Sequence, residues 1–170
     1  GGVGKTTLAR AIFDTLSNQF EAKSFVENVK DVSKASPSGL QLLQKQILSD
    51  VFYEDVTVKS VHEGTNLMKR RLHKKFLIVL DDVDHKDQLV ALAGDLNWFK
   101  PGSRIIITTR DEQVLIAHRV KLIHTVNLLS NDEAIRLFNR HAFGKDVQIQ
   151  EYKKQSLEVV RYAAGLPLAL

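Results

Sequence analysis

Cysteine is absent from this chain, proline occurs 3 times and methionine once. The absence of cysteine excludes disulfides, thiolate metal sites and cysteine nucleophiles, and it fits a reducing compartment. No apolar run approaches the roughly 20 residues of a membrane helix, so we expect no membrane segment. The net charge of +4 suits ligands that carry phosphate, but it is too small to indicate nucleic acid by itself.

The apolar content indicates a folded domain. Of the 170 residues, 44% are hydrophobic and 26% are charged, which is enough for a real core and excludes a disordered tail. The single methionine is Met68, and the chain opens on Gly1 without a charged and then apolar leader. We therefore expect a piece of a longer protein.

Strands and helices alternate along most of the chain. The run at residues 76–80 is continuously apolar, and so are residues 105–107 within a second strand expected at 104–108, which is typical of strands buried on both faces of a parallel sheet. Further strands are expected at residues 24–29 and 122–126. Helical periodicity covers residues 6–16, 40–52, 60–72, 86–93 and 111–118. This alternation predicts an α/β fold with a parallel sheet.

The pattern changes near residue 128. Two helices, at residues 131–143 and 150–164, follow each other without a strand between them. Ser130 and Glu133 have the spacing of a capping box at the start of the first helix. We expect a sheet domain over residues 1–128 and a small helical subdomain over residues 129–170.

The first residues match most of a phosphate-binding loop, which ends in Gly4-Lys5-Thr6. Glycines let backbone N–H groups surround an anion, and the following helix points its positive end at the same place. In such a loop Lys5 reaches the β- and γ-phosphates, and the Thr6 hydroxyl holds Mg²⁺. The first glycine of the motif and the strand that feeds the loop would precede residue 1.

Two carboxylates follow the apolar run that ends at Leu80. In open parallel sheets, ligands bind outside the carboxyl ends of the strands, and Asp81 and Asp82 are expected at that edge. Asp81 would hold Mg²⁺ through its water shell, and Asp82 would polarise the attacking water. An acidic turn is usually a solvated part of the surface. The interpretation of these aspartates as metal and water groups therefore depends on their occurrence together with the phosphate loop.

Arg110 ends the next apolar strand at the same edge. A guanidinium there can contact the γ-phosphate and report its presence. Residue type alone favours the alternative, an ordinary surface arginine that pairs with Asp111.

Five motifs occur in a fixed order. They are Gly-Gly-Val-Gly-Lys-Thr-Thr-Leu-Ala at 1–9, Phe-Val-Glu-Asn-Val at 25–29, Lys-Lys-Phe-Leu-Ile-Val-Leu-Asp-Asp-Val-Asp at 74–84, Gly-Ser-Arg-Ile-Ile-Ile-Thr-Thr-Arg-Asp at 102–111 and Gly-Leu-Pro-Leu-Ala-Leu at 165–170. Together they resemble the NB-ARC domain of plant disease-resistance proteins, from the phosphate loop to the Gly-Leu-Pro-Leu motif. Asp84 closes the Asp-Asp-Val-Asp motif, and an aspartate at this place is similar to the branch of the family that carries an N-terminal TIR domain.

The resemblance implies a P-loop NTPase sheet without its first strand, followed by part of the helical ARC1 subdomain. Because that first strand is central in the family's sheet, two apolar strand edges are expected to be unpaired. The implied function is a switch in defence signalling, which binds ADP at rest, exchanges it for ATP and is reset by slow hydrolysis. The ATPase is thus weak, and the cofactors are ADP or ATP with Mg²⁺.

The resemblance also assigns roles to residues. Asp82 is the catalytic carboxylate, while Thr6 and Asp81 serve the metal. Pro167 is expected near the adenine. The nucleotide-binding residues implied by the family are Gly2, Gly4, Lys5, Thr6, Thr7, Arg110 and Pro167.

The expected partners are an adenine nucleotide, the TIR, winged-helix and leucine-rich-repeat parts of a parent receptor, and further copies in an oligomer formed on activation. The receptor is expected in the cytoplasm, with the nucleus as an alternative. Two other functions stay open: a P-loop ATPase or transcription regulator that turns over in bulk, and a nucleic-acid-binding module supported by the positive charge alone. The basic run at residues 69–75 is better explained as solvated charge at a helix end.

Overall fold

The computed structural model describes residues 1–72, 74–144 and 152–170. The chain divides into two compact units. The first, here called the sheet unit, is Thr6–Ile123. The second, the helical unit, combines Gly1–Lys5 with His124–Leu170. Each unit is described by itself.

The sheet unit is built on a 3-stranded parallel sheet in the order β1-β2-β3. The confirmed α/β architecture follows from this sheet and the helices between its strands. Its strands are β1 (Ala22–Val26), β2 (Phe76–Val83) and β3 (Arg104–Thr109). Its helices are α1 (Lys5–Leu16), α2 (Val29–Ala35), α3 (Gly39–Phe52), α4 (Val61–Arg71), α5 (Lys86–Leu92) and α6 (Glu112–Ala117), with short 3₁₀ turns at Ser17–Gln19 and Leu96–Trp98.

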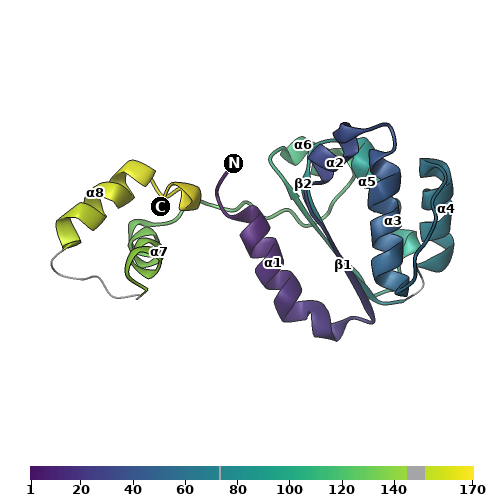
Figure 1. Ribbon diagram of the computed structural model, residues 1–170, viewed down its shortest axis with the longest axis horizontal. Helices are drawn as coiled ribbons and strands as arrows, with labels where there is room; N and C mark the ends of the chain where they lie inside the picture. Colours follow the sequence, from purple (N-terminus) through teal and green to yellow (C-terminus); the bar gives the residue numbers. More distant parts are fainter. Residues whose placement is uncertain (73, 145–151) are drawn as a thin grey trace. The chain divides into compact units, whose positions relative to one another are not determined.

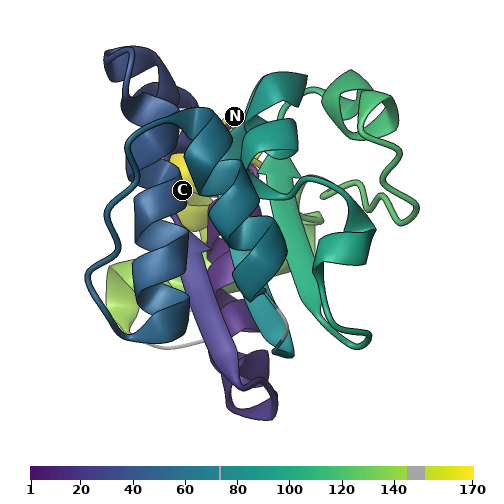
Figure 2. The ribbon, with the colours of Figure 1, turned by 90° about the vertical axis from the view of Figure 1, so that its right-hand side faces the viewer.

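Helices cover both faces of the sheet. Figure 1 shows α1 on one face and α2, α3, α4 and α5 on the other. In Figure 2 the layer that contains α3 and α4 faces the viewer, and the strands lie behind it. The core lies between this layer and β2, with Ile47, Met68 and Ile78 all 0% exposed. None of the helices that the structure describes combines the length and apolarity needed to cross a lipid bilayer.

The two outer strands differ from the central one. β2 has a strand on each side, and seven of its eight residues are buried. Along β3 the isoleucines at 105–107 are only half-buried, and among the described residues no strand pairs with the other edge of β3.

The strand predicted over residues 122–126 is wrong. That segment has no regular secondary structure, and Leu122 is 92% exposed. An apolar run becomes a strand only where a neighbouring strand satisfies its backbone N–H and C=O groups. Among the described residues no strand takes that place beside it.

Two other boundaries differ from expectation. The strand predicted at residues 24–29 lies at Ala22–Val26 instead, because Val29 already begins the unpredicted helix α2. Asn28, at the start of that helix, has a φ of 52° and turns the chain out of the sheet. β2 runs past the predicted end at Leu80 and includes both aspartates that follow it.

The helical unit contains α7 (Asn131–Phe143), α8 (Lys153–Ala163) and a 3₁₀ turn at Pro167–Ala169. The predicted capping box is present: the Ser130 hydroxyl accepts from the Glu133 N–H, and Glu133 Oε2 accepts from the Ser130 N–H at 2.9 Å. The Ser130 hydroxyl also donates to Glu133 Oε2 at 2.7 Å. This side-chain bond most of all, and then the bond from the Ser130 N–H, lowers the pKa of the Glu133 carboxyl. Residues 150 and 151 of the predicted second helix lie outside the described residues.

Candidate functional site

Asp81 lies at the carboxyl end of β2 and is 3% exposed. The Thr6 hydroxyl lies 2.8 Å from its Oδ1 and 3.0 Å from its Oδ2. The Thr108 hydroxyl of β3 donates to Oδ1 at 2.6 Å. The structure therefore places Thr6, at the start of α1, in contact with Asp81, the carboxylate predicted to share the metal with it.

The groups around Asp81 suit a magnesium ion. Buried carboxylates are normally paired with a cation or coordinate a metal, yet no side chain in the described residues forms an ion pair with Asp81. The described residues also hold no cluster of three or more His, Asp or Glu side chains that could bind a metal. Mg²⁺ does not need one, because it is bound by one or two protein oxygens together with waters and phosphates. A carboxylate beside a threonine hydroxyl supplies those oxygens.

Asp82 is the second carboxylate at this edge, and its backbone is unusual. Its φ is +54°, in the left-handed region that few non-glycine residues adopt. Its N–H donates to the Thr108 hydroxyl at 2.9 Å. The Arg110 guanidinium donates through Nε to its Oδ1 at 3.1 Å. The side chains of Asp81 and Asp82 thus have different partners: two hydroxyls for the first and a guanidinium for the second.

Arg110 forms an ion pair with Asp82. The alternative interpretation of the sequence was a surface pair with Asp111. The Asp111 side chain instead accepts from the Gln113 N–H at 2.9 Å and caps α6. Arg110 keeps a side chain that is 62% exposed.

The glycine loop belongs to the helical unit, and α1 begins at Lys5. Gly2 and Gly4 have φ values of +81° and +88°, which other residues rarely adopt. A Cβ on Gly2 would lie 2.9 Å from the Leu168 Cβ, and the Leu168 N–H donates to the Gly2 carbonyl at 3.2 Å. The structure therefore brings the Gly-Leu-Pro-Leu segment onto Gly2, and Pro167 begins the 3₁₀ turn that makes this contact. Thr7 is exposed in the first turn of α1.

Thr108 is the residue that the sequence reasoning missed. It is 8% exposed and contacts both consecutive aspartates. A signal was present in the sequence, since Thr108 lies one residue before Thr109-Arg110 at the end of a strand expected beside β2. Residue type alone does not separate it from a threonine chosen for its preference for strands.

Asp84, two residues beyond Asp82, contacts side chains of two helices. Its carboxylate accepts from Lys34 of α2 and, at 2.9 Å, from the Gln88 side chain of α5. Partial burial raises the pKa of this carboxyl, but the hydrogen bonds from Lys34 and Gln88 and the charges of Lys34 and Lys30 outweigh it and lower the pKa overall. Asp84 therefore joins α2 to the start of α5.

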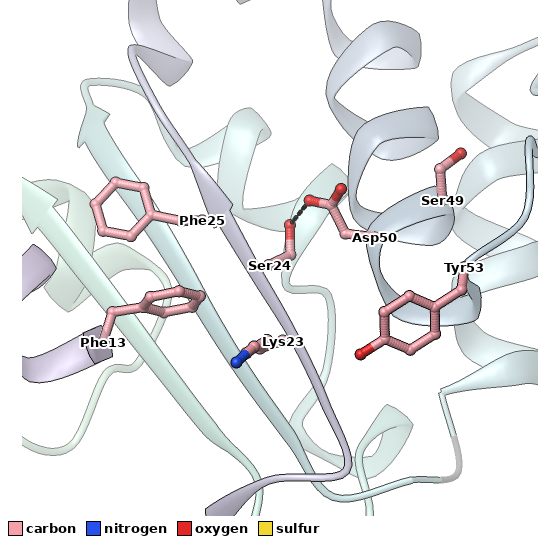
Figure 3. A pocket seen from close by; sticks show the side chains of 7 residues that line it. All are labelled: Phe13, Lys23, Ser24, Phe25, Ser49, Asp50 and Tyr53. Atoms are coloured by element: carbon pink, nitrogen blue, oxygen red, sulfur yellow. Dashed lines mark hydrogen bonds between the residues drawn. The ribbon is translucent and has the colours of Figure 1, made fainter. Parts of the chain in front are cut away.

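A separate pocket of about 420 Å³ lies along the free edge of β1 (Figure 3). In it the Ser24 hydroxyl donates to the Asp50 carboxylate at 2.6 Å. None of its lining residues is one that the sequence predicts to bind nucleotide. They are Phe13, Lys23, Ser24, Phe25, Ser49, Asp50 and Tyr53.

Comparisons with known proteins agree on one family. The family model for the NB-ARC domain matches residues 1–148. The chain is 48% identical over its whole length to TMV resistance protein N of Nicotiana glutinosa. It is 39% identical over 99% of its length to disease resistance protein RPP4 of Arabidopsis thaliana, and 40% identical over its whole length to disease resistance protein RUN1 of Vitis rotundifolia.

The chain corresponds to a small part of these relatives. It covers 15% of the length of protein N and of RPP4, and 13% of the length of RUN1.

Proposed function

This chain belongs to the NB-ARC domain family, and from that premise we propose that it is the nucleotide-binding switch of a plant disease-resistance receptor. The observation that carries the proposal is Asp81, a carboxylate that is 3% exposed and whose partners are two hydroxyls. One of those hydroxyls belongs to Thr6, which directly follows the glycine loop and Lys5. This is the arrangement expected of a phosphate loop and the metal carboxylate that serves it.

The proposed site uses the groups at the start of α1 for the phosphates. The glycine loop, with Gly2 and Gly4, supplies backbone N–H groups, and Lys5 supplies a point charge for the β- and γ-phosphates. Thr6 and Asp81 hold Mg²⁺, which neutralises charge on the phosphate oxygens. Thr7 adds a hydroxyl on the same turn.

Asp82 and Arg110 are the proposed groups for hydrolysis. Asp82 orients and polarises the attacking water, and Arg110 contacts the γ-phosphate. Their mutual ion pair supports this pairing of roles, because it places the two side chains together, and a guanidinium binds phosphate oxygens as well as a carboxylate. We expect hydrolysis to be slow and to reset the switch from ATP to ADP.

The proposed nucleotide is adenine, with Pro167 near the base. The sequence lacks the Asn-Lys-x-Asp motif that guanine-specific switches typically carry. Equal displacement of bound ADP by GTP and by ATP at the same concentration would contradict this part of the proposal.

The wider protein is proposed to be a receptor with a TIR domain, a winged-helix subdomain and leucine-rich repeats. Support comes from Asp84 and from the relatives, of which the chain covers 13–15% of the length. We propose that it acts in the cytoplasm or the nucleus and forms an oligomer on activation.

The test is single-turnover ATP hydrolysis measured beside ATP affinity in the full-length protein. Asp82→Asn, which tolerates the left-handed backbone, is expected to slow hydrolysis by about 10²-fold or more and to leave ATP affinity unchanged. Asp81→Asn is expected to weaken Mg²⁺-dependent binding itself. Asp55→Asn, at a side chain 81% exposed, is the control and should match the wild type.

Undiminished hydrolysis in Asp82→Asn would remove its assigned role. Weaker ATP binding without slower chemistry in that variant would exchange the roles of the two aspartates. Rapid multiple turnover in the wild type would favour a bulk ATPase over a switch.

A further inference from the structure

The pairing of β2 with β3 is irregular at the proposed site. Leu80 lies opposite Ile107, and Val83 lies opposite Thr109. Three steps along β2 therefore match two steps along β3, so Asp81 and Asp82 together face the single residue Thr108. This is a β-bulge, an irregularity that is frequent beside functional sites because it redirects a side chain.

The Thr108 hydroxyl connects the two residues of the bulge. It donates its hydrogen to Asp81 Oδ1 at 2.6 Å and accepts the Asp82 N–H at 2.9 Å. A hydroxyl has one hydrogen to give and lone pairs to receive, so this arrangement uses both capacities. The first bond is the shorter of the two.

We propose that Thr108 is a positioning residue for both aspartates, a role that rests on the nucleotide-binding function proposed above. Through the first bond it fixes the rotation of the Asp81 carboxylate, so that this carboxylate stays oriented toward the Thr6 hydroxyl, with which it would hold Mg²⁺. Through the second it holds the backbone of Asp82 at a φ of +54°. That backbone conformation turns the Asp82 side chain toward Arg110 instead of along the strand.

Strand formation alone does not account for the hydroxyl. Valine has nearly the same shape and at least as strong a preference for strands. A buried hydroxyl costs free energy unless it is bonded, and Thr108 is 8% exposed. A threonine here is therefore explained by the two bonds that it makes.

The test compares Thr108→Val, which removes the hydroxyl, with Thr108→Ser, which keeps it. In full-length protein, Thr108→Val is expected to need roughly tenfold more Mg²⁺ for half-maximal ATP binding, since one hydrogen bond to a charged group corresponds to about a power of ten. Single-turnover hydrolysis at saturating Mg²⁺ and ATP is also expected to fall by roughly tenfold or more, because Asp82 loses its fixed orientation. ADP affinity in excess chelator should stay unchanged, and Thr108→Ser should restore all values to near those of the wild type.

The matched control is Thr109→Val, the same substitution one residue along β3. The Thr109 hydroxyl contacts the backbone of Asp111 and neither aspartate of the bulge. Its Mg²⁺ dependence should equal that of the wild type.

Two outcomes would overturn the proposal: wild-type Mg²⁺ dependence and hydrolysis in Thr108→Val, or equal losses in Thr108→Val and Thr108→Ser. The Asp81→Asn variant separates this failure from that of the proposed function. If Asp81→Asn loses Mg²⁺-dependent binding while Thr108→Val does not, the role of Thr108 is wrong and the nucleotide site stands. If Asp81→Asn binds Mg²⁺ and ATP like the wild type, the proposed function itself fails.

Discussion

The sheet unit and the helical unit bury different kinds of side chain. In the sheet unit the fully buried positions are mostly large and apolar, as with Phe76 and Leu80 at 0% exposure. In the helical unit the buried residues include Asn139 at 0% and Ser156 at 1%, while Tyr162 and Leu168 are 92% and 81% exposed. The apolar core cluster of the described residues therefore lies in the sheet unit, whereas the helical unit buries few side chains, some of them polar.

The same substitution in both units gives the largest expected effect. Val79 of β2 is 0% exposed and Val160 of α8 is 2% exposed. Val79→Ala is expected to lower the free energy of unfolding by about 2 kcal/mol or more, because the densely packed sheet cannot close the cavity. Val160→Ala should cost less, since its helix has fewer neighbours to lose.

Urea unfolding can follow the two units separately. Trp98 is the single tryptophan and packs against the core of the sheet unit, so its fluorescence reports that unit, while circular dichroism reports all helices. Equal shifts of the Trp98 transition in both variants would contradict the larger effect expected for Val79→Ala.

The sequence predicted those elements best whose signals come from residues close together in the chain. The capping box at Ser130 lies within four residues, and the helix that it begins was predicted correctly. The strands at β2 and β3 were predicted from unbroken apolar runs. Residues 122–126 carried a similar apolar signal and form no strand, because pairing depends on a neighbour that a local pattern does not reveal.

The candidate site shows the same limit. Asp81, Asp82 and Arg110 follow apolar runs, so their place at the strand ends could be predicted. Thr108 could not be singled out, because its contact with both aspartates depends on the register shift between Leu80 and Val83. The roles of all these residues stay predictions.

Asn139 offers a smaller effect of opposite sign. It is 0% exposed, and within the part of the chain that the structure describes neither its Nδ2 nor its Oδ1 has a hydrogen-bond partner. Asn139→Leu should raise the free energy of unfolding of the helical unit by about 1–3 kcal/mol, because the cost of burying an unbonded amide disappears. Thermal unfolding followed by circular dichroism measures this, with exposed Asn131→Leu as the control within about 0.5 kcal/mol of the wild type. Destabilisation by Asn139→Leu would show that the amide has a favourable role.

The smallest expected effects are acid-dependent, with one carboxylate in each unit. The pKa values of Asp84 and Glu133 are lowered in the folded protein. Their contributions are therefore present above the unfolded pKa and lost as the pH falls through the folded pKa, below about pH 4. Asp84→Asn should cost less than about 1 kcal/mol at pH 7, because its pair with Lys34 is partly exposed.

Measurement of unfolding at pH 7 and pH 3 checks this prediction. The difference between wild type and Asp84→Asn should shrink at pH 3. Glu133→Gln keeps a capping-box partner but cannot titrate, so it should reduce the acid sensitivity of the helical unit alone. A difference at Asp84 that grows toward pH 3 would have the wrong sign for a lowered pKa.

The central claim is that Asp81, held against Thr6 at the end of β2, serves the metal of a bound adenine nucleotide. Calorimetric titration of ATP into the full-length protein, with Mg²⁺ and with chelator, tests it most directly. The account predicts that Mg²⁺ strengthens ATP binding to the wild type and that Asp81→Asn loses this gain while keeping its affinity in chelator. Equal strengthening by Mg²⁺ in both proteins, or no binding of ATP to the wild type, would contradict the account.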